Sequence, residues 1–106
     1  MSIPRKIPEV VKKEIGRIDK ESEVILFGSR ARGDYSIESD WDFLILLNSS
    51  ITNELEKTVR NKLYEIELET GEIITSIIEE KTEWEKYGQT RIYRNIEEQG
   101  ILVTTR

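Results

Sequence analysis

Residues 27–47, FGSRARGDYSIESDWDFLILL, decide the fold, because a Gly-Ser loop and two carboxylates stand beside an apolar run. The run Trp41–Leu47 is nearly all apolar, which predicts a central strand covered on both faces. Asp40 and Asp42 lie at its start. Alternate residues of a strand point to the same face, roughly 6.5–7 Å apart. Both carboxylates are therefore predicted to face one way, and the aromatic residues beside them the other.

The two aspartates form a predicted divalent-cation site. Two carboxylates on one face repel each other unless a cation neutralises them. Mg²⁺ prefers oxygen ligands and commonly binds one or two carboxylates together with substrate phosphates. An Asp-x-Asp pattern is common, so on its own it indicates a metal site only weakly.

The loop before the aspartates has residues suited to phosphate. Gly28 has no side chain, so a ligand can approach the backbone closely. Ser29 offers a hydroxyl and could cap a short helix, whose N-terminus would attract phosphate. Arg30 and Arg32 match the geometry of phosphate oxygens. A plain turn with surface charges is the alternative, but the combination at fixed spacing favours phosphoryl or nucleotidyl transfer.

The rest of the chain predicts a mixed α/β fold, a small mixed sheet flanked by helices. Apolar periodicity and turn residues indicate one domain, residues 1–106. Helices are expected at Pro8–Ile18, at Thr52–Glu69, from a capping box at Thr82–Glu85, and around Ile92–Ile96. Strands are expected at Val24–Phe27, Trp41–Leu47 and Glu72–Ile78, with a short strand or tail at Ile101–Val103.

Composition excludes several kinds of chemistry. The 106 residues include no histidine and no cysteine, which excludes histidine zinc sites, Ser-His-Asp triads and disulfides. The formal net charge of −5 argues against a surface that grips a nucleic-acid template. No apolar run is long enough for a signal peptide or a membrane span, so no membrane partner is expected and the expected location is the cytoplasm.

The pattern Gly28-Ser29, ten residues, then Asp40-x-Asp42 resembles the signature of the DNA polymerase β-like nucleotidyltransferase superfamily. The resemblance is strongest to its minimal, single-domain branch, the antitoxin-type domain. The segment Tyr93–Ile101 is similar to the closing segment of many such domains. The motif is specific, although it spans only about a fifth of the chain.

The resemblance implies a role for each motif residue. Gly28 and Ser29, helped by Arg30, would bind the triphosphate of ATP or another nucleoside triphosphate. Asp40 and Asp42 would be catalytic and would hold Mg²⁺. AMP would be joined to a hydroxyl acceptor on a HEPN-type partner protein, with this chain as the antitoxin of a toxin–antitoxin pair.

The family site has a third carboxylate on a later strand, and this part of the pattern is not evident. The matching strand is Glu72–Ile78, whose interior has no acid. Glu72 would serve if the register allows; otherwise it only follows the helix stop at Gly71, and Glu79 and Glu80 are solvated. A site with only two carboxylates would transfer slowly, or only when a partner completes it. The alternative to an enzyme is a nucleotide-binding module that neutralises or scaffolds a partner.

Other features leave alternatives open. An antibiotic nucleotidyltransferase would need a drug-binding surface from a partner or a homo-oligomer. The glutamate-rich helix at Thr52–Glu69 is either a solvated face or a docking face. Trp84 is expected to be packed, and Tyr35 either stacks on a base or is an ordinary loop residue.

Overall fold

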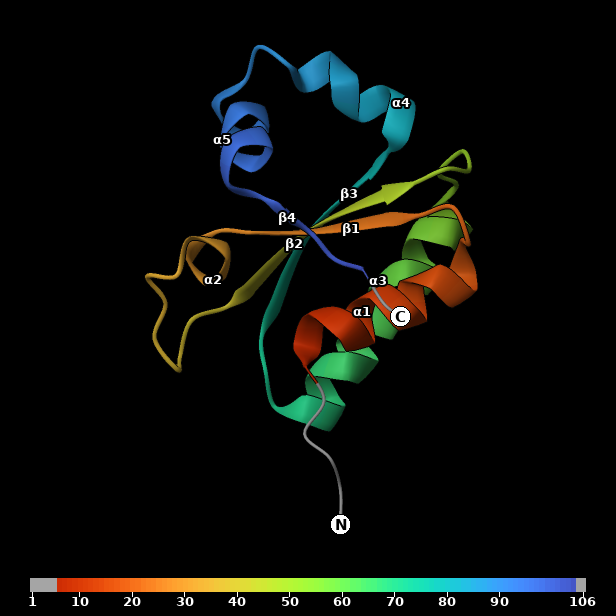
Figure 1. Ribbon diagram of the computed structural model, residues 1–106. Helices are drawn as coiled ribbons and strands as arrows, with labels where there is room; N and C mark the ends of the chain where they lie inside the picture. Colours follow the sequence, from red (N-terminus) through yellow and green to blue (C-terminus); the bar gives the residue numbers. More distant parts are fainter. Residues whose placement is uncertain (1–5, 105–106) are drawn as a thin grey trace.

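A mixed four-stranded sheet forms the centre of the computed structural model, which describes residues 6–104 (Figure 1). The strands lie in the order β3-β2-β1-β4. Strand β2 runs antiparallel to β1 and parallel to β3, and β4 is antiparallel to β1. The strands are β1 (Glu23–Phe27), β2 (Trp41–Leu47), β3 (Ile74–Glu80) and β4 (Ile101–Leu102). The predicted α/β class with a small mixed sheet is confirmed.

The helices form two layers, one on each face of the sheet (Figure 1). One layer is α1 (Ile7–Ile18) and α3 (Asn53–Thr70). The other comprises α4 (Lys81–Trp84), the 3₁₀ turn η1 (Glu85–Tyr87) and α5 (Arg91–Gln99). The short helix α2 (Ser29–Arg32) follows β1 directly.

Side chains of β2 alternate between two hydrophobic clusters, one under each layer. Phe43, Ile45 and Leu47 belong to the cluster with α1 and α3, whereas Leu44 and Leu46 belong to the cluster with Trp84 and Ile96. Burial of each such side chain stabilises the fold by about 1.5–3 kcal/mol. The predicted packing of Trp84 is confirmed, because only 6% of this residue is exposed.

Helix α3 begins and ends within one residue of the predicted range Thr52–Glu69. The Thr52 hydroxyl accepts a hydrogen bond from the Leu55 amide, which satisfies one free donor of the first turn. Gly71 ends the helix with a φ of 76°, a conformation that glycine adopts without a Cβ clash.

Two of the predicted helix caps are wrong. Glu80, not Thr82, is the N-cap of α4, because β3 leads directly into that helix and makes Thr82 its second residue. No side-chain bond caps α4, so the expected capping box is absent there. Gly28, not Ser29, is the N-cap of α2, again without a side-chain bond. A threonine does cap α5, since the Thr90 hydroxyl accepts from the Tyr93 amide.

Strand β3 starts two residues later than predicted. The Trp41 amide donates to the Ile73 carbonyl, so pairing starts where β2 starts, and residues 72–73 connect the helix stop to the strand. The last two strand residues are not simply solvated. Glu79 accepts from the Tyr87 hydroxyl at 3.2 Å, and Glu80 accepts from the Ile51 amide at 2.9 Å.

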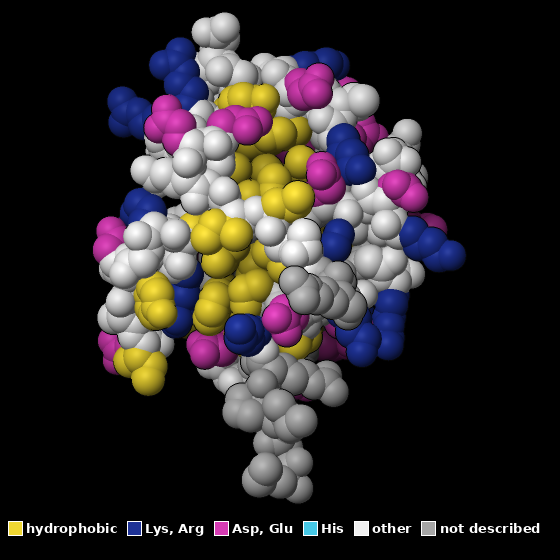
Figure 2. Space-filling view, viewed as in Figure 1, with side chains coloured by type: hydrophobic (Ala, Val, Ile, Leu, Met, Phe, Trp, Pro, Cys, Tyr) yellow, Lys and Arg dark blue, Asp and Glu magenta, His cyan; other side chains and the backbone are white. Residues whose placement is uncertain are grey.

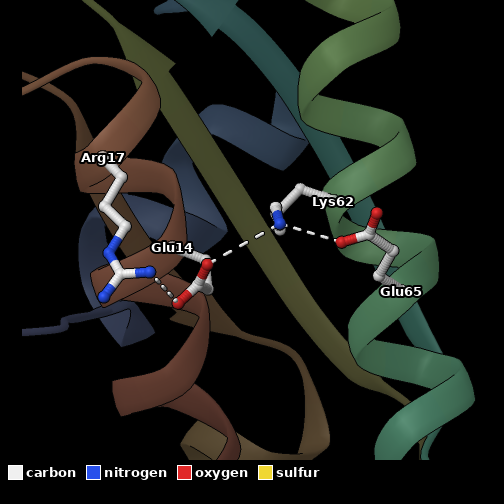
Figure 3. A network of polar contacts seen from close by, with 4 residues as sticks. All are labelled: Glu14, Arg17, Lys62 and Glu65. Carbon is white, nitrogen blue, oxygen red and sulfur yellow. Dashed lines mark hydrogen bonds and ion pairs between the residues drawn. The ribbon is translucent and has the colours of Figure 1, made fainter.

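A polar network joins the outer surfaces of α1 and α3 (Figure 3). Lys62 of α3 contacts Glu65 at 2.8 Å and Glu14 of α1 at 3.8 Å, and Glu14 also contacts Arg17. Partly exposed ion pairs contribute about 0–1 kcal/mol each. The apolar contacts beneath the network therefore supply most of the attraction between these helices. No helix within residues 6–104 is long and apolar enough to cross a membrane.

Candidate functional site

Asp40 and Asp42 lie at the start of β2, on the face covered further along by α4 and α5. Asp42 and Leu44 are two residues apart on β2, so their side chains point to the same face, and Leu44 packs under that layer. Trp41 and Phe43 pack on the opposite face, in the α1–α3 cluster. The orientation predicted from alternation is therefore confirmed, whereas the metal-binding role of the aspartates stays a prediction.

Gly28 and Asp42 are in direct contact, which brings the loop and the carboxylates together. Phe27, the last residue of β1, pairs with Asp42 across the antiparallel ladder. Gly28 follows with a φ of 74°, and a Cβ placed on it would overlap the Asp42 carboxylate. Glycine is thus required here twice, for its backbone angle and for the room that the carboxylate occupies.

The surroundings of Asp42 disfavour its ionised form. Partial burial is the main cause that raises the pKa of this carboxyl, and the negative charge of Asp40 raises it further. Arg32 lowers it and so compensates in part. The pair therefore carries negative charge that the chain itself neutralises incompletely, which a bound cation would stabilise.

Arg30 is engaged with the loop between α2 and β2. Its Nη2 donates to the carbonyls of Ser39 and Ile37 at 3.0 and 3.3 Å, and its Nε donates to Ser39 at 3.3 Å. The guanidinium carbon lies 4.7 Å from the ring centroid of Tyr35 and 4.2 Å from that of Trp41. Arg30 therefore ties the Gly-Ser loop to the residue directly before Asp40.

Arg32 differs from Arg30 in its contacts. Its only ion pair within residues 6–104 is with Asp34 at 3.3 Å, on the surface. The positive charge of Arg32 also acts on Asp42, because it offsets part of the rise in the pKa of that carboxyl. Within the described residues, the guanidinium group of Arg32 therefore makes fewer contacts than that of Arg30.

Thr75 is the side chain that β3 places beside the two aspartates. It pairs with Asp42 in the parallel ladder, and its hydroxyl donates to Asp40 at 3.4 Å. Glu72 precedes the strand. It is two residues before Ile74, which packs against the α1–α3 cluster on the face opposite the aspartates. Within the described part of the chain, no group of three acidic side chains could hold a metal ion.

Sequence reasoning did not identify Thr75 as a site residue. A hydroxyl pair, Thr75 and Ser76, interrupts the apolar residues of EIITSII, and this was the available signal. Choosing between the two hydroxyls requires the register of β3 against β2, which only the structure supplies.

Comparison with known proteins identifies the family. The model of the nucleotidyltransferase domain family matches residues 5–103, nearly the whole chain. The chain therefore belongs to the nucleotidyltransferase domain family and is a nucleotidyltransferase. Enzymes of this class act on nucleoside triphosphates and generally use divalent metal ions.

Two relatives from Methanocaldococcus jannaschii carry the name putative protein adenylyltransferase. One is 42% identical over 73 residues, which cover 67% of this chain and 74% of the relative. The other is 35% identical over 88 residues, which cover 83% and 80%. A crystal structure of a toxin–antitoxin with AMP-PNP is similar at a TM-score of 0.64 and 12% identity, covering 95% of this chain and 75% of that one. At that identity, the likeness shows the fold alone.

Proposed function

We propose that this chain transfers AMP from ATP to a hydroxyl group of a partner protein, in a reaction that depends on Mg²⁺. The observation that carries the proposal is the contact between Gly28 and Asp42, which joins a candidate phosphate loop to a candidate metal pair. The names of the two archaeal relatives support adenylyl transfer to protein.

The donor set beside the loop fits Mg²⁺. Asp40, Asp42 and Thr75 offer only oxygen atoms, which is the ligand type that this hard cation takes. Asp42 is partly buried beside the negative charge of Asp40, and Arg32 compensates for this charge only in part. When bound there, Mg²⁺ would supply charge neutralisation for the triphosphate.

The chain's own residues then have distinct roles in the proposed reaction. Gly28 and Ser29 bind the triphosphate through the loop, and Arg32 faces its negative charge. The acceptor oxygen attacks the α-phosphorus, the bond between the α- and β-phosphates breaks, and pyrophosphate leaves. The acceptor proton passes to solvent, since the described residues offer no third carboxylate at the site. The protein contributes mainly positioning and electrostatic stabilisation.

The partner in this proposal is a HEPN-type protein, with this chain as the antitoxin. The similar fold of a toxin–antitoxin structure supports such a pairing. The exposure of Asp40 supports it too, because an acceptor hydroxyl can approach the carboxylates from that side.

Isothermal titration of ATP tests the nucleotide site, with Mg²⁺ and with EDTA, on the wild type and on Asp42→Asn. We expect binding that needs Mg²⁺ and is lost in the variant, since one of two carboxylate ligands is gone. Thr70→Ser, far along the chain at the end of α3, is the matched control and should bind as the wild type does. Binding of ATP that is equally strong in EDTA and in Asp42→Asn would reject the metal role.

One observation favours a second candidate, a module that binds a partner without efficient turnover. Thr75 lies where a third acidic ligand would complete the pair. The double variant Asp40→Asn/Asp42→Asn separates the two candidates in a toxicity assay with the partner. Neutralisation that survives the double change would favour the binding module, and neutralisation that is lost would favour adenylyl transfer.

A further inference from the structure

A hollow lies on the same face of the sheet as the aspartates, toward the other end of β2. Its volume is about 440 Å³, and it opens between the sheet and the layer of α4 and α5. We call it the α5 groove. Figure 2 shows hydrophobic side chains gathered in this hollow, with acidic side chains beside it. Its apolar lining consists of Ile25, Leu46 and Leu102 from the sheet and Trp84, Tyr93 and Ile96 from the helical layer.

The charged residues that line the α5 groove are mostly acidic. They are Glu23, Glu85 and Glu97, against the single cation Lys81. Among residues 6–104, none of these four forms an ion pair. An apolar hollow with a polar rim is typical of an interaction site. Because three carboxylates face one ammonium group, negative charge is in excess at the rim, and the complementary occupant is both apolar and cationic.

The edge of the sheet beside the groove favours a polypeptide over a small cation. Strand β4 has only two residues and is the outermost strand next to β1. Its Ile101 and Leu102 are 50% and 52% exposed, one on each face of the sheet. An open strand edge offers unpaired N–H and C=O groups to an extended chain.

We infer that the α5 groove and the β4 edge bind an extended, basic and apolar segment of the acceptor protein. Apolar side chains of this segment occupy the groove, and its Lys or Arg residues lie beside the three glutamates. The inference rests on the proposed function in naming the segment as part of the acceptor. Leu46 in the groove and Asp42 are four strand residues apart, about 13 Å. A segment docked here therefore brings a hydroxyl about four residues away to the aspartates.

The test is an NMR titration of the whole chain, without nucleotide or metal. The probe is a synthetic peptide of alternating lysine and leucine, compared with an equally long peptide of alternating glutamate and leucine. We expect saturable shifts of the Trp84 indole signal and of the groove amides with the basic peptide only. Shifts spread evenly over the acidic surface would overturn the inference.

Two triple variants with the same change in net charge sharpen the test. Replacing all three rim glutamates by glutamine should weaken binding about tenfold, as expected for three lost exposed ion pairs. The control, Glu21→Gln/Glu54→Gln/Glu69→Gln, changes exposed residues away from the groove and should bind within about twofold of the wild type. Equal weakening by both triples would overturn the inference.

Two further outcomes separate the inference from its rivals. Concentration-dependent shifts of groove signals without peptide would assign the groove to a second copy of this chain and overturn it. A native Trp84 signal in each variant confirms folding, so lost binding cannot be ascribed to unfolding. If the wild-type chain binds the basic peptide but does not bind ATP, the proposed function is contradicted and the docking surface is still supported.

Discussion

Replacing Arg30 tests whether this arginine holds the site together or contacts the nucleotide. The sequence assigns it to phosphate, whereas the structure engages it with the carbonyls of Ile37 and Ser39. Arg30→Lys retains the positive charge but removes the planar fork that reaches both carbonyls. Arg30→Met removes the charge as well and keeps an unbranched side chain of comparable reach.

The contacts of Arg30 allow the effect on stability to be estimated. Hydrogen bonds to the two carbonyls contribute about 1 kcal/mol each. Its positions over Tyr35 and Trp41 contribute about 0.5–1 kcal/mol each. Because these contacts share one side chain and are not additive, we expect Arg30→Met to lower the free energy of unfolding by about 2–3 kcal/mol. For a domain of this size, the melting temperature should fall by roughly 10–20 °C, and Arg30→Lys should cause about half of this.

Thermal unfolding followed by circular dichroism measures the stability, and terbium luminescence measures the cation site. Trp41 lies between the two aspartates in sequence and can sensitise a bound terbium ion. We expect both Arg30 variants to bind terbium more weakly, because the Ser39 carbonyl and hence Asp40 lose their anchor. Arg32→Met is the matched control and should change stability by about 0.5 kcal/mol or less, since its ion pair is exposed.

The opposite pattern would refute this reasoning. If Arg30 binds phosphate by charge, Arg30→Lys would keep the melting temperature and terbium affinity, and ATP affinity alone would fall in Arg30→Met. If Arg30 holds the loop, terbium binding without nucleotide already falls in Arg30→Lys. Arg32→Met should weaken ATP binding with little change in terbium affinity. Loss of ATP binding alone therefore marks an arginine that contacts phosphate, whereas loss of terbium binding marks an arginine that holds the loop.

Three further changes test the site. Gly28→Ala should abolish Mg²⁺-dependent ATP binding in titration calorimetry, because its Cβ would displace Asp42. Gly33→Ala is the control, since Gly33 has a similar φ of 89° but open space around it; this variant should retain binding and lose only about 1–2 kcal/mol of stability. In EDTA, Asp42→Asn should raise the melting temperature at pH 7, since an ionised carboxylate with a raised pKa destabilises the folded chain. This gain should vanish as the pH falls through the pKa of Asp42, where the wild-type carboxyl is neutral; a gain that persists at low pH would contradict this origin. Thr75→Asp should bind Mn²⁺ on the order of tenfold more tightly than the wild type by adding a charged ligand, whereas an affinity no higher than that of Thr75→Val would show that this position does not face the metal pair.

Sequence patterns that act over a few residues predicted the orientation of side chains on β2 and the ends of α3. The alternation of a strand correctly oriented Asp40 and Asp42, because side chains alternate between the two faces and Phe43 is buried on the opposite one. The end of α3 was predicted from Gly71, whose backbone angle acts within one turn, and the predicted start lies at Thr52, the residue that caps the helix.

Long-range register and loop geometry could not be predicted in the same way. The position of Thr75 opposite Asp42 depends on how β3 aligns with β2 after an intervening helix, and nothing in the strand sequence fixes that alignment. The contacts of Arg30 span nine residues of irregular chain to Ser39 and follow no period. The expected cap at Thr82 failed because the sheet carries β3 to Glu80 and leaves no free turn before the helix.

The division of labour between the two arginines explains how the chain accommodates a repelling carboxylate pair. If both guanidinium groups faced Asp40 and Asp42, the pair would be neutralised internally and a cation would gain little by binding. Instead, Arg30 is held by the loop carbonyls, and only Arg32 lowers the pKa of Asp42. Gly28 has no Cβ and so leaves space for the Asp42 carboxylate, but it supplies no positive charge to neutralise it. The residual negative charge is thus built into the fold, and the same charge is what makes a divalent cation and its triphosphate the complementary ligands.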